Sequence, residues 1–371
     1  MKIAFVNYTP LIYTVETPYS APLGGSESAM CYLAEALAKR GHEIFLYTRI
    51  NEAQNIRGVM HLPDGEIRKA KDLDVLIIQN TPFCVTEIQP YLNKKTKVIL
   101  WLEHAHDQPA VSCLNDKNIV NLYSSIIFIS QWQKQQFLAN FPLGTGNCFI
   151  LRNAISPAFE NLFLTGEKIS IKKIQPPVIA YTSTPFRGLN RLLKIFPIVR
   201  NEFPDVRLQV FSSMKVYQQN QTQDEKDFGD LYEQCRKTAG IELIGSLSQS
   251  QLAQRLKPVS ILAYPSTFLE TGCTSVLEAM SAGCQIITSD LGALPETSSG
   301  FGKLIDFRLS EDEYLKEFAA AIIESLRKIY SHEFGGIDDV LTRQVYFTNQ
   351  AYNWKKRAQE WEFFLQNNVL N

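Results

Sequence analysis

Residues 260–290 read SILAYPSTFLETGCTSVLEAMSAGCQIITSD, and this stretch decides the interpretation of the whole chain. An apolar run ends at Ser266, a loop of small and polar residues follows, and a second apolar run closes the stretch. Between the runs we expect a helix from about Cys273 to Ala282, which Gly283 stops. Runs as uniformly apolar as these are typical of parallel strands that helices cover on both faces. The stretch therefore predicts a strand–helix–strand unit of an α/β fold.

Two glutamates lie eight positions apart in this unit, Glu270 in the loop and Glu278 in the helix. The free N–H groups and the dipole at the start of a helix favour an anion there, and Gly272 lets the anion approach the backbone. Eight helical residues extend about 12 Å along the axis, and carboxylates accept hydrogen bonds from diols. The layout suits a ligand with phosphates between two hydroxylated ends, such as a nucleoside diphosphate sugar. By itself the spacing favours a plainer alternative, in which Glu270 is a surface residue and Glu278 belongs to a structural ion pair.

The same alternation of apolar strands and amphipathic helices runs through the rest of the 371 residues, which are too many for one core. It predicts two doubly wound, Rossmann-like α/β domains, whose ligands lie beyond the carboxyl ends of the strands. We expect an N-terminal domain over residues 1–165, a C-terminal domain over residues 176–345 and a C-terminal helix over residues 346–371. The linker is the polar segment that ends in Pro176-Pro177, and Ser26 is the expected N-cap of the first helix.

The composition is that of an ordinary globular protein, with 45% hydrophobic and 20% charged residues and a formal net charge of −1. This balance gives no sign of nucleic-acid binding. The seven cysteines are scattered and include no Cys-x-x-Cys pair, which indicates small buried side chains in a reducing compartment. The N-terminus lacks the apolar region of a signal peptide and no run of about 18 apolar residues occurs, so a cytoplasmic location is expected.

Residues 264–296, YPSTFLETGCTSVLEAMSAGCQIITSDLGALPE, resemble the E-x7-E signature region of the large bacterial family 4 of retaining glycosyltransferases. The stretch PLGGSESAMCYLAEALAKRGHEIFLYT resembles the family's N-terminal Gly-Gly loop, first helix and second strand. FISQWQ resembles its serine-containing loop, LRNAI its Asn-Gly-Ile turn and ELIGSLSQSQL its base-binding loop, so the resemblance covers most of the chain. These enzymes have the GT-B fold, and the resemblance implies two Rossmann-like domains that face a central cleft.

The resemblance also implies an activity, the transfer of a hexosyl unit from a nucleoside diphosphate sugar to an acceptor hydroxyl with retention of configuration. No metal or other cofactor is implied, and the departing phosphate itself would take the acceptor proton. Family frequency points to UDP-glucose as the donor and to a saccharide or lipid-linked saccharide as the acceptor, in surface or exopolysaccharide synthesis. Any contact with the inner face of the cell membrane would be peripheral.

Carried over position by position, the resemblance implies that Glu278 holds the donor ribose and that Glu270 orients hydroxyls of the transferred sugar. Arg187 would neutralise the leaving diphosphate, and His104 would contact the donor sugar. The other implied donor contacts are Gly24, Gly25, Ser183, Arg191, Gly245, Leu247, Thr271, Gly272, Cys273, Thr274 and Ser275. An alternative interpretation of Gly24 and Gly25 is a flexible turn before a helix, without contact to the donor.

One departure from the family pattern lies in residues 181–194, YTSTPFRGLNRLLK, which resemble its basic loop for the diphosphate. Arg187 matches the second basic position, but Tyr181 occupies the first. Ser183 and Arg191, the latter one helical turn beyond Arg187, are candidates to compensate. The missing charge also supports an alternative, a nucleotide-sugar-binding protein that has lost turnover.

Residues 97–110, KVILWLEHAHDQPA, place His104 and His106 after a strand. A His-x-His pair can bind zinc, but no further ligand follows at zinc-like spacing, so no metal site is expected. The family has a histidine after this strand, and His104 matches it better, whereas His106 could serve the acceptor or only pack. Asp72-Leu73-Asp74 matches the D-x-D of metal-dependent transferases but precedes a strand, which indicates a loop-to-strand junction.

Further alternatives concern the enzyme class and the C-terminal segment. A GT-B phosphorylase or a sugar-phosphate synthase would use free phosphate or a sugar phosphate. A nicotinamide oxidoreductase is disfavoured because no G-x-G-x-x-G follows the first strand. The aromatic and basic residues within 354–364 fit a membrane-surface helix or the C-terminal helix of the family, which packs on the first domain and which we favour.

Overall fold

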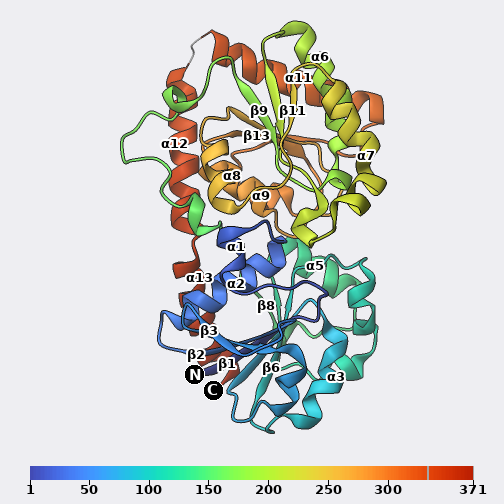
Figure 1. Ribbon diagram of the computed structural model, residues 1–371, viewed down its shortest axis with the longest axis vertical. Helices are drawn as coiled ribbons and strands as arrows, with labels where there is room; N and C mark the ends of the chain where they lie inside the picture. Colours follow the sequence, from blue (N-terminus) through green and yellow to red (C-terminus); the bar gives the residue numbers. More distant parts are fainter. Residues whose placement is uncertain (332–333, 371) are drawn as a thin grey trace. The chain divides into compact units, whose positions relative to one another are not determined.

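The computed structural model describes residues 1–331 and 334–370. They group into two compact units, each built around its own sheet (Figure 1). The first unit consists of Met1–Pro18, Gly24–Ala154 and Trp354–Asn371, and the second of Tyr19–Leu23 and Ile155–Asn353.

The first unit contains an eight-stranded sheet of order β3-β4-β2-β1-β5-β6-β7-β8. Every neighbouring pair is parallel except β3 and β4, which form an antiparallel hairpin at one edge. The winding changes direction between β1 and β5, which is the topological switch point of this sheet. The strands are β1 (Lys2–Val6), β2 (Glu43–Thr48), β3 (Gln54–Ile56), β4 (Val59–Pro63), β5 (Val75–Gln79), β6 (Lys97–Leu102), β7 (Ser125–Phe128) and β8 (Cys148–Ile150).

Alternate strand residues of this sheet point to opposite faces, and both faces are covered by helices. Leu100 packs on one face in a core that includes Ile88 and Phe137 of the covering helices. On the other face, the rings of Trp101 and Trp361 lie 5.3 Å apart. The helices are α2 (Gly25–Ala38), α3 (Val85–Ile88), α4 (Lys117–Val120), α5 (Gln131–Asn140) and α13 (Trp354–Phe364), and the short α1 (Thr17–Ser20) is divided between the two units.

The C-terminal helix α13 packs on α2 within the first unit. Trp354, Trp361 and Phe364 are each no more than 4% exposed, and the Trp354 ring lies 5.9 Å from the ring of Tyr32. Only Phe363 among these aromatic side chains of α13 is largely exposed, at 67%. The aromatic residues of this helix are therefore used for packing in the unit, and they do not form an exposed apolar face.

The second unit contains a six-stranded sheet of order β11-β10-β9-β12-β13-β14, in which all neighbours are parallel. In chain order this is 3-2-1-4-5-6, the doubly wound arrangement of dinucleotide-binding domains, and its switch point lies between β9 and β12. The strands are β9 (Val178–Tyr181), β10 (Arg207–Val210), β11 (Ile241–Leu243), β12 (Ile261–Tyr264), β13 (Gln285–Ser289) and β14 (Lys303–Ile305).

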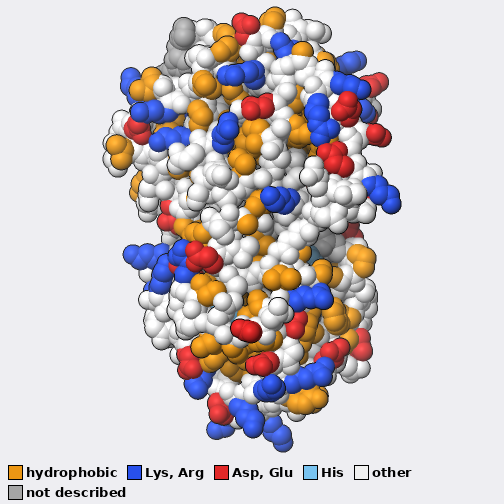
Figure 2. All heavy atoms as spheres, viewed as in Figure 1, with side chains coloured by type: hydrophobic (Ala, Val, Ile, Leu, Met, Phe, Trp, Pro, Cys, Tyr) orange, Lys and Arg blue, Asp and Glu red, His pale blue; other side chains and the backbone are white. Residues whose placement is uncertain are grey.

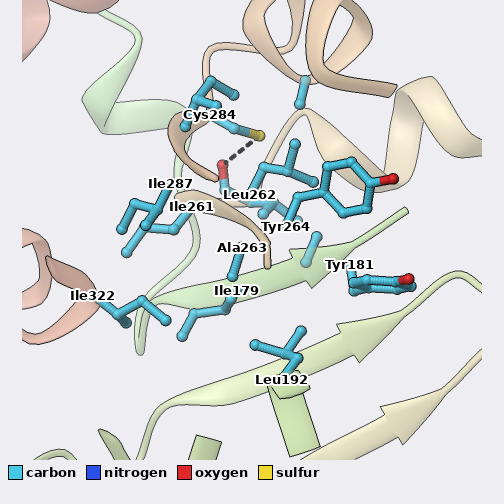
Figure 3. Packing of buried hydrophobic residues seen from close by; sticks show 14 of the residues in the cluster. Ile179, Tyr181, Leu192, Ile261, Leu262, Ala263, Tyr264, Cys284, Ile287 and Ile322 are labelled. Atoms are coloured by element: carbon cyan, nitrogen blue, oxygen red, sulfur yellow. Dashed lines mark hydrogen bonds between the residues drawn. The ribbon is translucent and has the colours of Figure 1, made fainter. Parts of the chain in front are cut away.

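Helices α6, α7 and α11 lie on one side of this sheet, and α8, α9 and α12 lie on the other (Figure 1). Figure 3 shows part of the core, in which Ile179 of β9 lies near Leu192 of α6 and Ile322 of α11. The helices are α6 (Leu189–Glu202), α7 (Gln221–Lys237), α8 (Gln249–Leu256), α9 (Thr274–Ser281), α10 (Leu294–Ser298), α11 (Glu311–Tyr330) and α12 (Phe334–Ala351). Helix α9 matches the expected helix to within one residue at each end, and Gly283 follows it with a φ of +68°.

The boundaries between the units differ from the expected ones. The first unit ends at Ala154 rather than at residue 165, because Ile155 is fully buried in the core of the second unit. The chain returns to the first unit at Trp354 rather than at residue 346, because α12 packs on α9 and belongs to the second unit. Residues 155–165, expected in the N-terminal domain, and residues 346–353, expected in the C-terminal helix, thus both belong to the second unit.

Basic and acidic side chains are interspersed over the face shown in Figure 2, without a large patch of one sign. This distribution agrees with the formal net charge of −1. Among residues 1–331 and 334–370, no helix has both the length and the apolar character needed to cross a membrane.

Candidate functional site

The loops after β9 and β12 flank the switch point of the second sheet, and each carries one charged residue. Arg187 lies in the loop after β9 and Glu270 in the loop after β12. Gly188 determines how closely the loops approach: its φ is +118°, and a Cβ there would lie 2.2 Å from the carbonyl oxygen of Pro265. Only glycine lets the two backbones meet at this point.

Arg187 is the cation of this site. Its Nη1 donates to Glu270 Oε1 at 3.0 Å, and its Nη2 donates to the Tyr217 hydroxyl at 3.3 Å. The guanidinium carbon lies 4.2 Å from the centroid of the Phe268 ring, which is a cation–π contact. The side chain is 21% exposed, so it is held in place and is still reached by solvent.

Glu270 is only 5% exposed and accepts a second hydrogen bond at the same Oε1, from the Tyr264 hydroxyl at 2.5 Å. Neither bond uses Oε2. The backbone is fixed as well, because Ala293 N donates to the carbonyl oxygen of Glu270 at 2.7 Å and a Cβ on Gly292 would lie 2.6 Å from that oxygen. The alternative of a surface Glu270 is therefore wrong, because its carboxylate is buried and forms an ion pair with Arg187.

Helix α9 begins four residues after Glu270, at Thr274. Its N-cap residue, Cys273, makes no side-chain cap hydrogen bond, and burial raises the pKa of its thiol well above the ordinary value. The hydroxyl of Ser275 donates to the carbonyl oxygen of Thr182 at 2.6 Å and so ties the first turn to the loop after β9. Because the cap is neutral, it does not offset the positive end of the helix dipole.

Glu278 lies further along α9 and is 4% exposed. Its Oε1 accepts a hydrogen bond from the backbone N of Ser156 at 3.2 Å, and the side chain of Gln249 also interacts with it. Burial raises the pKa of Glu278 to about 8, and the two hydrogen bonds offset only part of that rise. The carboxyl group is therefore mostly protonated near neutral pH, when it can both donate and accept hydrogen bonds.

Several buried polar atoms near the carboxyl ends of β9 and β10 have no hydrogen-bond partner within the described part of the chain. They are Thr182 Oγ1, Thr184 Oγ1, Arg187 Nε and Ser212 Oγ. An unpaired buried polar group costs about 1–3 kcal/mol, so such groups are expected where a ligand or bound water completes the structure. Their position beside the switch point makes this edge of the sheet the candidate binding site.

Arg191, a candidate to replace the missing basic residue, is held by other groups. Its Nη2 lies 2.7 Å from Glu311, and its guanidinium carbon lies 4.5 Å from the ring centroid of Tyr314, both on α11. The guanidinium therefore joins α6 to α11 through Nη2, while its buried Nη1 has no hydrogen-bond partner among the described residues. Ser183 lies closer to the charged pair, because its hydroxyl donates to that of Tyr264 at 3.4 Å.

The remaining predicted contacts of this unit lie in loops at the same edge of the sheet. Thr271 is buried and Gly272 is partly exposed, directly before α9. Gly245 and Leu247 follow β11, where the hydroxyls of Ser213 and Ser246, from neighbouring loops, lie 2.7 Å apart.

In the first unit, α2 begins at Gly25 with Gly24 as its N-cap. The expectation that Ser26 is the cap is wrong, because the backbone N of Ser28 already donates to the carbonyl oxygen of Gly24 and extends the helix to the glycines. A Cβ on Gly25 would meet no atom within 4 Å. Packing within the chain therefore does not explain why a glycine stands there.

The two histidines after β6 differ in their surroundings. Burial lowers the pKa of His104, whose backbone carbonyl accepts a hydrogen bond from Gln133 Nε2 at 2.8 Å. The ring of His106 lies 6.4 Å from that of Trp132. In the described residues, no group of three or more His, Cys, Asp or Glu side chains is arranged to hold a metal ion. Asp74 directly precedes β5, so the D-x-D match is a loop-to-strand junction, as predicted.

The first unit also contains a buried polar cluster that was not predicted from the sequence. Glu103 accepts hydrogen bonds from Gln79 Nε2 at 2.9 Å and from Asn153 Nδ2 at 2.8 Å, and Gln79 also accepts one from Asn7. Burial raises the pKa of Glu103 to about 7. Asn7, Gln79 and Glu103 stand at the ends of three neighbouring strands, and a polar residue at the end of each apolar run was the signal that could have revealed them.

Comparison with known proteins gives matches to the second unit and to the fold of the whole chain. Residues 169–328 match the family model described as Glycosyl transferases group 1. No curated protein matches the chain. Sucrose-phosphate synthase from Thermosynechococcus elongatus superposes with a TM-score of 0.71 at 11% identity, over 99% of this chain and 98% of its own.

Two further solved structures are similar over the same length. A glycosyltransferase from Rickettsia africae has a TM-score of 0.71 at 12% identity, over 100% of this chain and 99% of its own. Anabaena Alr3699/HepE in complex with UDP-glucose has a TM-score of 0.69 at 15% identity, over 99% of both chains. Identities this low establish a shared fold only. Arg187, Glu270 and Glu278 all lie within the matched residues 169–328. The chain therefore has the GT-B fold and carries, over residues 169–328, a domain that matches the group 1 glycosyl transferases.

Proposed function

We propose that the protein is a retaining glycosyltransferase of family 4, which transfers a hexosyl unit from a nucleoside diphosphate sugar to an acceptor hydroxyl. The observation that carries this proposal is the Arg187–Glu270 pair at the switch point of the second sheet, four residues before the uncapped start of α9. A cation and a helix N-terminus suit a diphosphate, and a carboxylate next to them suits the hydroxyls of a sugar.

The diphosphate is bound by Arg187 and by the backbone N–H groups around Thr274 and Ser275. These groups stabilise the negative charge that grows on the leaving nucleoside diphosphate, without a resident metal or other cofactor. Removal of one well-placed donor of this kind typically raises the barrier by about 3–4 kcal/mol. Gly24 and Gly25 contribute backbone N–H groups from the first unit, and the open space at Gly25 is compatible with the close approach of a ligand.

Each glutamate of the E-x7-E motif takes one end of the donor. Glu270 orients hydroxyls of the transferred sugar through its carboxylate. Glu278 binds the ribose diol, and its raised pKa supports a neutral carboxyl group that donates one hydrogen bond and accepts another. His104 contacts the sugar, and Gly245 and Leu247 contact the base.

We assign no carboxylate as a covalent nucleophile. In the proposed mechanism, the departing phosphate instead takes the acceptor proton on the same face of the sugar.

UDP-glucose is the first donor to try, because the similar Anabaena structure contains it. The proposed acceptor is a saccharide or a lipid-linked saccharide in surface or exopolysaccharide synthesis, which would bring the protein into peripheral contact with a membrane.

A thermal-shift panel of nucleotide sugars, followed by an assay of nucleoside diphosphate release, tests the proposal. We expect one nucleotide sugar to raise the melting temperature and to be turned over slowly even with water as the acceptor. Proton NMR of the product reports the anomeric configuration. Turnover only with free phosphate or with a sugar phosphate would favour the phosphorylase or synthase alternative. Binding without any turnover would favour a non-catalytic protein, and no stabilisation by any compound would refute the proposal.

A further inference from the structure

Tyr181, which stands at the position of the missing basic residue, packs against Tyr264 and closes the loop after β9 with a hydrogen bond. Tyr181 ends β9, is fully buried, and donates its hydroxyl to the carbonyl oxygen of Thr184 at 2.8 Å. Its ring meets that of Tyr264, at the end of the neighbouring strand β12, edge-on with centroids 5.9 Å apart. Figure 3 shows the two rings at the ends of these strands, with both hydroxyls pointing to the same side.

Tyr264 connects this aromatic pair to the charged pair. Its hydroxyl donates to Glu270 Oε1 at 2.5 Å, the same oxygen that Arg187 Nη1 contacts at 3.0 Å. Tyr264 is 1% exposed, and burial raises its pKa well above the ordinary value, so the phenol keeps its proton and remains a donor. A short bond to a carboxylate is among the stronger hydrogen bonds in proteins.

In the proposed function, the sugar of the donor needs the Glu270 carboxylate and the diphosphate needs the Arg187 guanidinium, and these two groups are now paired with each other. When a diphosphate binds Arg187, it competes with Glu270 for the guanidinium. Glu270 is 5% exposed, so without a second donor it would be a buried carboxylate without a partner, which is costly. The phenol of Tyr264 supplies that second donor, and it does so without adding a positive charge that would hold the carboxylate more firmly.

We propose that Tyr264 is a positioning residue, which holds the Glu270 carboxylate in place for the sugar hydroxyls while the donor diphosphate takes over Arg187. Tyr181 supports it by fixing the ring of Tyr264 through the edge-on contact. The tyrosine that replaces the basic residue at 181 thus contributes to the placement of Glu270. This inference rests on the proposed function, because it assigns a part to one more residue of the same site.

Tyr264→Phe is the test, because it removes one hydroxyl and keeps the ring against Tyr181. We expect kcat for UDP release from UDP-glucose, or from the nucleotide sugar that the panel identifies, to fall about 10- to 100-fold, as for the loss of a hydrogen bond to a charged group. The affinity for UDP alone, measured by calorimetry, should change less than about twofold, because UDP lacks the sugar that Glu270 orients. If Tyr264 only stabilised the fold, Tyr264→Phe would lower both kcat and the affinity for UDP.

A double-mutant cycle with Glu270→Ala separates action through Glu270 from any other effect. Once the carboxylate is absent, Tyr264→Phe should lower kcat by less than about threefold further. Tyr123→Phe is the matched control, because Tyr123 is a buried tyrosine of the first unit whose hydroxyl donates to the carbonyl oxygen of Pro82 at 2.6 Å. It should lower the melting temperature about as much as Tyr264→Phe and leave kcat unchanged.

Wild-type turnover distinguishes the failure of this inference from the failure of the proposed function. If the wild type releases UDP and Tyr264→Phe does so at the same rate, the part assigned to Tyr264 is refuted and the proposed function stands. Equal losses of kcat with and without the Glu270 carboxylate, or a loss of UDP affinity as large as that of kcat, would refute it as well. If the wild type turns over no nucleotide sugar, both fall.

Discussion

Replacement of Gly188 by alanine tests whether the contact between the two loops holds the site together. Gly188 has a φ of +118° and stands between Arg187 and the start of α6. A Cβ there would lie 2.2 Å from the carbonyl oxygen and 2.9 Å from the carbonyl carbon of Pro265. Both are backbone atoms, so they cannot give way by changing a rotamer, and the two loops must move apart.

The expected cost has two parts. The left-handed backbone costs a non-glycine residue about 1–2 kcal/mol, and forcing an extra carbon into a packed site adds about 1–3 kcal/mol. Gly300→Ala isolates the first part, because Gly300 has a φ of +80° and a Cβ there would meet no atom within 4 Å. For a unit of this size, the difference of about 1–3 kcal/mol corresponds to about 2–12 °C in melting temperature.

Gly188→Ala should lower both kcat and the melting temperature, whereas Gly300→Ala should lower only the melting temperature. A shift of about 1 Å in a group that positions a substrate can cost about 100-fold in rate, and the Arg187 guanidinium is carried by the residue next to Gly188. Calorimetric melting and UDP release of both variants provide the measurements. Equal melting temperatures and equal kcat values for Gly188→Ala and Gly300→Ala would show that the clash with Pro265 has no consequence for the site.

Three other predictions concern single side chains. Arg187→Ala should lower kcat about 100-fold or more with an unchanged circular dichroism spectrum, and near-normal turnover would reject its part in binding the diphosphate. The pKa of Glu278 is raised from 4.5 to about 8, so its contribution to the free energy of unfolding is full below about pH 4.5 and is lost as the pH rises through 8. In urea unfolding, the free energy of unfolding should therefore fall less steeply between pH 4.5 and 8 in Glu278→Gln than in the wild type. The same pH dependence in both proteins would contradict a raised pKa of the buried Glu278. Trp361→Ala should cost about 3–5 kcal/mol, whereas Phe363→Ala, at an exposed position of the same helix, should change the free energy of unfolding by no more than about 0.5 kcal/mol.

The fold could be predicted from the sequence because its elements are marked by local patterns. Helix α9 was placed to within one residue, since an apolar strand, a glycine stop and helical spacing all agree over residues 260–290. The hairpin of β3 and β4 was missed, because β3 is mostly exposed and lacks an apolar run. Its two-residue turn, Arg57-Gly58, has φ angles of 52° and 82°, and an X-Gly turn between short strands was the available signal.

The pairing within the candidate site could not be predicted from the sequence. The family resemblance pointed to Arg187 and Glu270 separately, but they are 83 positions apart in the chain, and only the sheet order brings their loops together. The part of Tyr264 depends on a side-chain direction at the end of a strand, which no spacing encodes. Arg191 was a candidate to compensate because it follows Arg187 by one helical turn, and its ion pair with Glu311, from a helix far along the chain, was not predicted.

The most direct test of the central claim is a crystal structure of the protein with the nucleotide sugar that stabilises it most. We expect the diphosphate within hydrogen-bond distance of Arg187 and of the backbone N–H groups at the start of α9, with Glu270 on the hydroxyls of the sugar. A nucleotide sugar bound elsewhere, with Arg187 still paired only to Glu270, would contradict the account.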